Sequence, residues 1–211
     1  MQKILLSTTY FGPIQWYQKL YRAEEVFIER CESFQKQTYR NRCLIATTNG
    51  IQALTVPVER QISSINNKLS TINTIKDLRI SDHGNWRHLH WNALKSAYGE
   101  SPFFDYYQDD IRPFFEQRWD YLFDFNEAIR EKMCELLDIQ PKVRLTKEFT
   151  AYSLRFTDDF RSTIRPKHPE PDADFTPKRY YQVYEQKHGF LPNLSILDLL
   201  FNMGPESIFY L

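Results

Sequence analysis

A polar stretch at residues 35–42 (Gln-Lys-Gln-Thr-Tyr-Arg-Asn-Arg) carries side chains well suited to binding an anion. Arginine presents a planar fork that donates two hydrogen bonds to a phosphate or carboxylate, and lysine adds a point charge. In an extended strand Arg40 and Arg42 face the same way, while Asn41, a further candidate for ligand binding, points to the opposite side. We therefore expect Lys36, Arg40 and Arg42 to hold one anionic group. The alternative is that they form structural ion pairs with Glu24, Glu25 and Glu29.

Two side chains are candidates for proton transfer. Glu29 ends an apolar segment and is either a general base or an ion-pair partner of the nearby arginines. His90 follows His83 and His88, and a histidine that titrates near neutral pH is the usual general base. A helix would point His88 and His90 about 200° apart, which argues against a shared metal ion, and we predict no metal site. The alternative for His90 is a structural histidine with its hydrogen bonds satisfied.

Five further residues are candidates for ligand contacts. The rings of Tyr10, Tyr39 and Trp86 are suited to stacking on a base or a sugar. Asp198 and Asn202 are four residues apart and share a helix face, where they either fix a ligand or cap backbone groups.

Composition and charge exclude several classes of protein. The 27 basic and 27 acidic side chains cancel, and no extended basic stripe occurs, which argues against a nucleic-acid-binding protein. No apolar run approaches the ~20 residues that span a bilayer, and residues 4–6 are too few for the core of a signal peptide. The cysteines, without CxxC spacing, do not indicate a disulfide scaffold or a zinc ribbon. These features predict a cytoplasmic protein.

The N-terminal residues predict a strand–helix–strand unit that would position these side chains. Residues 3–10 form an apolar strand, Pro13 opens a helix, and residues 26–28 form a second strand. Ligands of such units bind outside the carboxyl ends of the strands. This rule points to Ser7, Thr8, Tyr10 and Glu29.

The rest of the chain predicts a hairpin followed by helices. Asn49-Gly50 between apolar runs at 43–47 and 52–58 is a strong hairpin signal. Further predictions are an exposed loop at 59–76, a short strand at 78–80, helices at 86–98, at 101–107 and from Pro113 to Leu137, a strand at 143–149, a Pro-rich loop at 165–178, and a helix from 196 to 201 capped by Ser195.

Together these elements predict an α/β or α+β protein that forms a single domain over residues 1–211. Its N-terminal strand–helix–strand and hairpin layer, mainly within 1–80, would be covered by a mostly helical region at 86–140. After the Pro-rich loop, a C-terminal segment at 180–211 would return onto the N-terminal sheet.

Several segments resemble the WbqC-like family. They are Tyr10-Phe11-Gly12-Pro13, the strand at 25–29, Lys36 to Arg42, Asn49-Gly50, Leu54 to Pro57, Trp86, His90, Tyr98-Gly99 and the closing stretch at 189–204. The resemblance extends nearly end to end and is weakest in the Pro-rich loop. Many members of that family carry His-Gln-Pro after the first strand, where this chain has Ser7-Thr8-Thr9.

The family takes its name from a protein encoded among bacterial O-antigen biosynthesis genes. The resemblance implies a role in surface-polysaccharide (lipopolysaccharide) or activated-sugar metabolism. We expect a transferase-type enzyme whose ligand is a phosphorylated or nucleotide-linked small molecule and whose donor is an activated sugar or acyl group. The alternative is a non-catalytic protein whose basic loop, the stretch at 35–42, docks onto a biosynthetic enzyme. The sequence identifies no cofactor.

Overall fold

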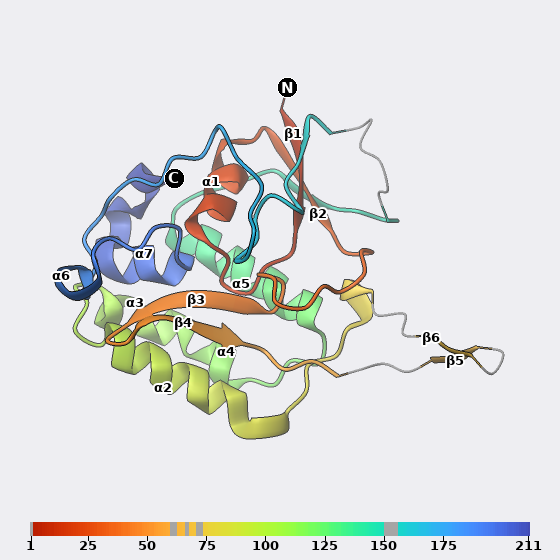
Figure 1. The fold of residues 1–211 in the computed structure, drawn as a ribbon, viewed down its shortest axis with the longest axis horizontal. Coiled ribbons are helices and arrows are strands. Elements are labelled where there is room, and N and C mark those ends of the chain that lie inside the picture. Colours follow the sequence, from red (N-terminus) through yellow and green to blue (C-terminus); the bar gives the residue numbers. More distant parts are fainter. Residues whose placement is uncertain (1, 60–62, 66–67, 71–73, 150–155) are drawn as a thin grey trace.

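The computed structural model describes residues 2–59, 63–65, 68–70, 74–149 and 156–211 (Figure 1). The fold is a mixed α/β arrangement, as predicted. Its main sheet is entirely parallel, with the strand order β7-β2-β1-β8. The four strands are β1 (Lys3–Ser7), β2 (Glu25–Glu29), β7 (Val143–Leu145) and β8 (Asp158–Asp159).

The predicted strand–helix–strand unit is confirmed, with α1 (Ile14–Arg22) joining β1 to β2. The first strand ends at Ser7 rather than at residue 10, because the chain then turns through Phe11, whose φ of 39° is incompatible with a strand. Pro13 precedes the helix as its N-cap. Residues 14–20 of α1 are all buried, so this helix lies in the interior rather than on the surface.

The predicted hairpin is also confirmed, as β3 (Arg42–Thr47) and β4 (Gly50–Thr55). Gly50 has a φ of 96°, which favours glycine at this turn. In Figure 1 the hairpin lies between α2 (Trp86–Tyr98) and the layer formed by the main sheet and α1.

The prediction of a loop at 59–76 is wrong for part of that segment. β5 (Ser63–Ile65) pairs with β6 (Lys68–Ser70), and a 3₁₀ turn, η1 (Ile75–Asp77), follows. Residues 60–62, 66–67 and 71–73 lie outside the described residues. The predicted strand at 78–80 is reduced to isolated bridges, in which Ile80 pairs with Val58 and Arg79 with Tyr121.

The helical region follows the prediction except that the helix predicted at 101–107 is shifted to 104–111 and the third helix is interrupted. η2 (His83–Asn85) leads into α2, and α3 (Phe104–Ile111) follows it. The helix predicted from Pro113 to Leu137 is divided into α4 (Pro113–Glu116) and α5 (Leu122–Leu136). It breaks because residues 120–122 form backbone hydrogen bonds of 2.9 Å with Leu78 and Ile80, which holds the connecting residues extended.

The C-terminal third packs onto the N-terminal unit. No helix or strand occurs at 165–178 within the described residues, in agreement with the Pro-rich composition. α6 (Glu185–His188), α7 (Ile196–Met203) and the 3₁₀ segment η3 (Gly204–Tyr210) follow. Ser195 caps α7 as predicted, because its side chain accepts a hydrogen bond of 3.3 Å from the backbone of Leu197.

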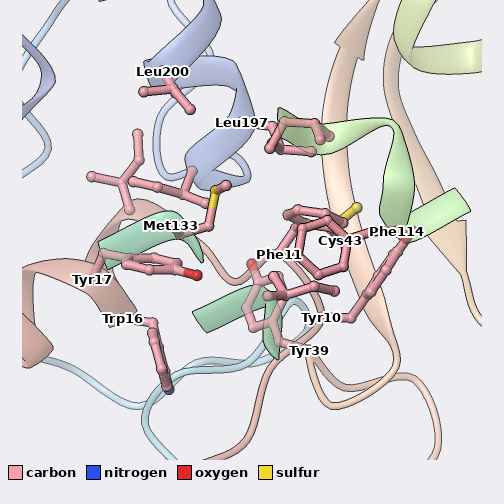
Figure 2. Packing of buried hydrophobic residues seen from close by; sticks show 14 of the residues in the cluster. Tyr10, Phe11, Trp16, Tyr17, Tyr39, Cys43, Phe114, Met133, Leu197 and Leu200 are labelled. Carbon is pink, nitrogen blue, oxygen red and sulfur yellow. The ribbon is translucent and has the colours of Figure 1, made fainter. Parts of the chain in front are cut away.

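A single apolar cluster joins these layers. Figure 2 shows Phe11 and Tyr17 from the first layer packed with Met133 of α5 and with Leu197 and Leu200 of α7. Each of these side chains is almost completely buried. Burial of one large apolar side chain stabilises the fold by about 1.5–3 kcal/mol. This core fixes the sheet against the helices and thereby holds the carboxyl ends of the strands in place.

Candidate functional site

The carboxyl ends of the four parallel strands carry one row of polar side chains. Ser7 and Glu29 are opposite each other at the ends of β1 and β2. Thr146 and Arg161 follow β7 and β8, and backbone hydrogen bonds from Thr146 to β2 (3.1 Å) and from Phe160 to β1 (2.9 Å) extend the register past the strand ends. We call Thr146, Glu29, Ser7 and Arg161 the carboxyl-edge row. It occupies the edge at which open α/β sheets bind ligands.

Glu29 is the most buried member of the row, with 0% of its side chain exposed. One of its oxygens, Oε1, accepts hydrogen bonds from the Thr146 hydroxyl (2.7 Å) and from the Cys31 backbone (2.8 Å). The other oxygen, Oε2, faces the Arg161 guanidinium at 3.5 Å. Arg161 also pairs with Asp159 at 2.7 Å. The Glu29 carboxylate is therefore held in one orientation by Thr146 after β7, by the Cys31 backbone and by Arg161 after β8.

Arg40 lies beside the row and binds its Ser7 member. Its guanidinium makes a fork to Glu32, with Nε 2.8 Å from Oε1 and Nη2 2.5 Å from Oε2, and Nη2 also donates to the Ser7 hydroxyl at 2.7 Å. The side chains of Arg40 and Glu32 are only 4% and 6% exposed. Taking such charges out of water costs several kcal/mol each, and their mutual attraction only roughly repays that cost.

The structure does not bring the three predicted cations to one point. Arg42 begins β3 and donates to the Thr55 hydroxyl at 2.9 Å, whereas Lys36 is exposed in the turn at 36–37. Asn41 is buried and donates to the Val56 carbonyl at 2.8 Å. Arg40 does form an ion pair, but with Glu32 rather than with Glu24, Glu25 or Glu29.

His90 and Tyr10 form a buried pair on the core side of α2. The Tyr10 hydroxyl lies 2.9 Å from His90 Nδ1, and the Trp86 ring packs edge-on against the imidazole at 5.2 Å. Burial lowers the pKa of His90 to about 4, although a hydrogen bond with the Thr55 backbone partly opposes this shift. The imidazole is therefore neutral at pH 7 and bonded within the protein.

The predicted stacking aromatics belong to the core. Tyr10, Tyr39 and Trp86 are all at most 5% exposed, so protein atoms already cover their rings. Burial raises the pKa of Tyr39 to about 12, which keeps its hydroxyl protonated. Figure 2 shows Tyr10 and Tyr39 among the packed residues.

Asp198 and Asn202 connect α7 to other segments. The Asp198 carboxylate is fully buried and accepts hydrogen bonds from Tyr98 (2.8 Å), Tyr180 (2.5 Å) and Gln182 (3.1 Å). Burial raises the pKa of Asp198 above its usual range. Asn202 donates to the Asp198 backbone at 2.7 Å. This network ties α2, α7 and the segment at 180–182 together.

Three residues of the edge were missed from the sequence: Glu32, Thr146 and Arg161. Thr146 follows β7, which pairs with β2, and Arg161 follows β8, which pairs with β1. Their place at the edge can be recognised only when these two pairings are known. Beside the row, the hydroxyls of Thr8 and Thr9 are buried and have no hydrogen-bond partner within the described residues.

Two further observations concern the kind of protein. Among the residues that the structure describes, no group of three His, Cys, Asp or Glu side chains could hold a metal ion. Within the same ranges, no helix combines the length and apolar character needed to cross a bilayer.

Comparison with known proteins supplies the family. The WbqC-like protein family matches residues 8–160 and 169–210, so Ser7 and Arg161 lie just outside the matched ranges. The uncharacterized protein Rv1507c of Mycobacterium tuberculosis (strain ATCC 25618 / H37Rv) is 26% identical over 234 residues, covering 100% of this chain and 98% of that protein. No solved structure matches the chain. The match over most of its length shows that the chain belongs to the WbqC-like protein family.

Proposed function

We propose that this protein is a cytoplasmic transferase-type enzyme that uses an activated sugar or acyl donor in surface-polysaccharide synthesis. The supporting observation is the buried charged network at the carboxyl edge of the parallel sheet. Apolar replacement of buried ion pairs is often neutral or stabilising, so stability alone gives little reason to keep such groups. Binding and chemistry at this edge give a reason.

In this proposal each charged group has a distinct role. Arg161 faces the phosphate or carboxylate of the donor, because its side chain is 14% exposed and that of Arg40 only 4%. Glu29, oriented by Thr146, receives the proton of the acceptor. The fork between Arg40 and Glu32 positions Ser7. We assign no proton-transfer role to His90, because its ring is buried and its Nδ1 lies within hydrogen-bond distance of the Tyr10 hydroxyl.

The proposed step is a group transfer. The hydroxyl or amine of the acceptor forms a bond to the sugar or acyl carbon of the donor. The bond from that carbon to the phosphate or thiol leaving group breaks, the leaving group keeps the electron pair, and Glu29 takes the proton from the nucleophile. A guanidinium beside the leaving group stabilises the negative charge that develops on it.

The test is a thermal-shift screen against nucleotide sugars, coenzyme A thioesters and free nucleotides. Wild type is compared with Arg161→Gln and with Arg144→Gln, an arginine in the middle of β7 that is 71% exposed and binds Glu25 at the amino end of β2. A ligand at 100 times its dissociation constant stabilises the folded state by about 2.7 kcal/mol. We expect one donor class to raise the melting temperature of wild type and Arg144→Gln to the same extent, and to raise that of Arg161→Gln by less.

A complementary measurement follows product formation from the donor that binds. Glu29→Gln should keep the ligand-induced shift but lose at least ~100-fold in turnover, as expected for removal of a general base. A folded protein that responds to none of these ligands would contradict the transferase proposal.

A docking function is the second candidate, and it is favoured by the exposure of residues 35–37. Lys36 stands in this turn with Gln37, whose φ is 59°. If no small molecule binds and Lys36→Glu abolishes association with a biosynthetic enzyme, the basic loop is a docking surface.

A further inference from the structure

A cavity lies away from the carboxyl edge, between α2 and the pair formed by α3 and α4. Its volume is about 560 Å³, within the range of small-molecule sites. Arg87, Trp91 and Lys95 line it from α2, at the four-residue spacing that places side chains on one helix face. Trp86 and His90 belong to the core side of the same helix. The cavity and the His90–Tyr10 pair therefore use different faces of α2.

The lining is rich in cations. Arg87, Lys95 and Arg112 contribute three positive charges, against the single carboxylate of Glu116. Arg112 reaches Glu116 at 2.5 Å, but both side chains are more than half exposed, so the pair opens at little cost. Lys95 is exposed and forms no ion pair with any described residue. An anionic ligand would be attracted to this surface.

Arg87 adds a guanidinium that is only partly used. Its Nη1 donates to Asp82 at 2.6 Å, and the group lies 4.8 Å from the centre of the Trp86 ring. Its Nε and Nη2 are buried and have no hydrogen-bond partner among the described residues. Buried N–H groups of a cation normally have acceptors, so their orphaned state points to an oxygen ligand.

The remaining lining is aromatic and amide. The indole of Trp91 is partly buried and is supported by the Phe104 ring at 6.0 Å and the Phe115 ring at 5.8 Å. The side-chain amides of Asn92 and Gln108 carry both donors and acceptors. A rigid aromatic wall with amides beside it suits a ring that bears polar substituents.

We propose that this cavity binds a phosphorylated small molecule whose ring packs against Trp91. Lys95, Arg112 and Arg87 bind the phosphate, and Asn92, Gln108 and Glu116 bind the polar groups of the ring. Nucleoside phosphates and sugar phosphates share this chemistry. The site is separate from the carboxyl edge, and it does not depend on the transferase proposal.

The test is calorimetric titration with four probes, namely UDP, glucose 1-phosphate, pyrophosphate and uridine. The first variant combines Lys95→Gln with Arg112→Gln, both exposed positions whose loss leaves the fold intact. The second is Trp91→Phe, which keeps an aromatic ring in the wall. The control is Arg179→Gln. Like Arg112, Arg179 is an exposed arginine (76%) that pairs with a glutamate, here Glu185.

We expect UDP or glucose 1-phosphate to bind wild type and the control alike, and more tightly than pyrophosphate or uridine. The double variant should weaken that binding roughly tenfold or more, as removal of charged hydrogen bonds does. Trp91→Phe should weaken the binding of the ring-bearing phosphate and leave the binding of pyrophosphate unchanged. Which of the two ligands binds more tightly identifies the ring.

Several results would overturn the proposal. They are no binding by any probe, equal affinity for pyrophosphate and the ring-bearing phosphates, or binding that survives in the double variant. Arg161→Gln separates the two sites, because it should leave this binding unchanged. Loss of binding in Arg161→Gln but not in the double variant would place the ligand at the carboxyl edge instead.

Discussion

The two ends of the parallel sheet carry the same kinds of charged side chain in very different surroundings. At the amino end, Glu25 binds Lys3 at 3.2 Å and Arg144 at 2.6 Å, and the two cations are 47% and 71% exposed. At the carboxyl end, Arg40 and Glu32 are 4% and 6% exposed. Water solvates the first set and is excluded from the second.

The charged side chains at the amino end are therefore surface groups, whereas those at the carboxyl end are buried in the fold. An exposed pair contributes at most about 1 kcal/mol, and its desolvation costs little. An enclosed pair carries a large desolvation cost, and removing one partner leaves the other uncompensated. Burying charged groups at the carboxyl edge therefore costs desolvation free energy. This cost is consistent with a role for these groups beyond stability.

The largest expected effect is on Arg40. Arg40→Ala leaves Glu32 buried without its fork, and we expect it to lower the free energy of unfolding by about 3–5 kcal/mol. Arg144→Ala, which removes one partner of Glu25 at the amino end, should lower it by less than about 1 kcal/mol. Urea denaturation at pH 7 measures both. Equal losses for the two variants would remove the distinction between the two ends.

A double replacement sharpens the same comparison. Combining Arg40→Met with Glu32→Leu removes both charges at once, and we expect it to recover most of the stability lost in Arg40→Ala. If the pair serves the site, this variant should be stable and inactive. A double variant as unstable as Arg40→Ala would mean that the network itself holds the edge together.

The next largest expected effect is the pH dependence of stability that results from the buried His90. His90 is buried with a pKa of about 4, below the value of about 6.5 in an unfolded chain. Because the folded pKa is the lower one, the unfolded state binds the proton first. Stability is then intact above pH 6.5 and falls by ~3 kcal/mol as the pH is lowered to 4.

Denaturation measured between pH 7 and pH 4 tests this expectation. His90→Gln, which still offers an acceptor to Tyr10, should lose this part of the pH dependence. His83→Gln, at an exposed position, serves as the control and should keep it. An unchanged slope in His90→Gln would show that another group causes the acid sensitivity.

The smallest effect concerns salt. At 1 M ionic strength the screening length is about 3 Å, so the contribution of the pairs around Glu25 should disappear. The cost of Arg144→Ala should then fall toward zero, while that of Arg40→Ala should persist. Repeating the urea series at low and high salt provides the measurement, and a salt-sensitive Arg40→Ala would indicate that water reaches the carboxyl edge.

Local signals in the sequence were enough to predict much of the fold. The first strand–helix–strand unit and the hairpin each have all their defining residues within a short stretch. Ser7 and Glu29 were predicted as edge residues because the ligand rule needs only the first two strands, although the first strand was predicted to extend to residue 10. Their partners from the last third of the chain could not be predicted in the same way.

The missed parts depend on contacts between distant segments. β8 consists of Asp158 and Asp159, two acidic residues with no strand periodicity, and it exists because it pairs with β1. The break between α4 and α5 likewise results from pairing with residues 78–80. Glu32 pairs with Arg40 because the loop between them folds back, and side-chain types alone do not determine that path.

The position of β8 also has a consequence for biosynthesis. β1 is synthesised before β8, its outer neighbour in the sheet, which follows it in the chain by more than 150 residues. Until then Ile4, Leu5 and Leu6, which are at most 1% exposed in the finished fold, form an unprotected sheet edge. We therefore expect chains that terminate before β8 to aggregate through β1.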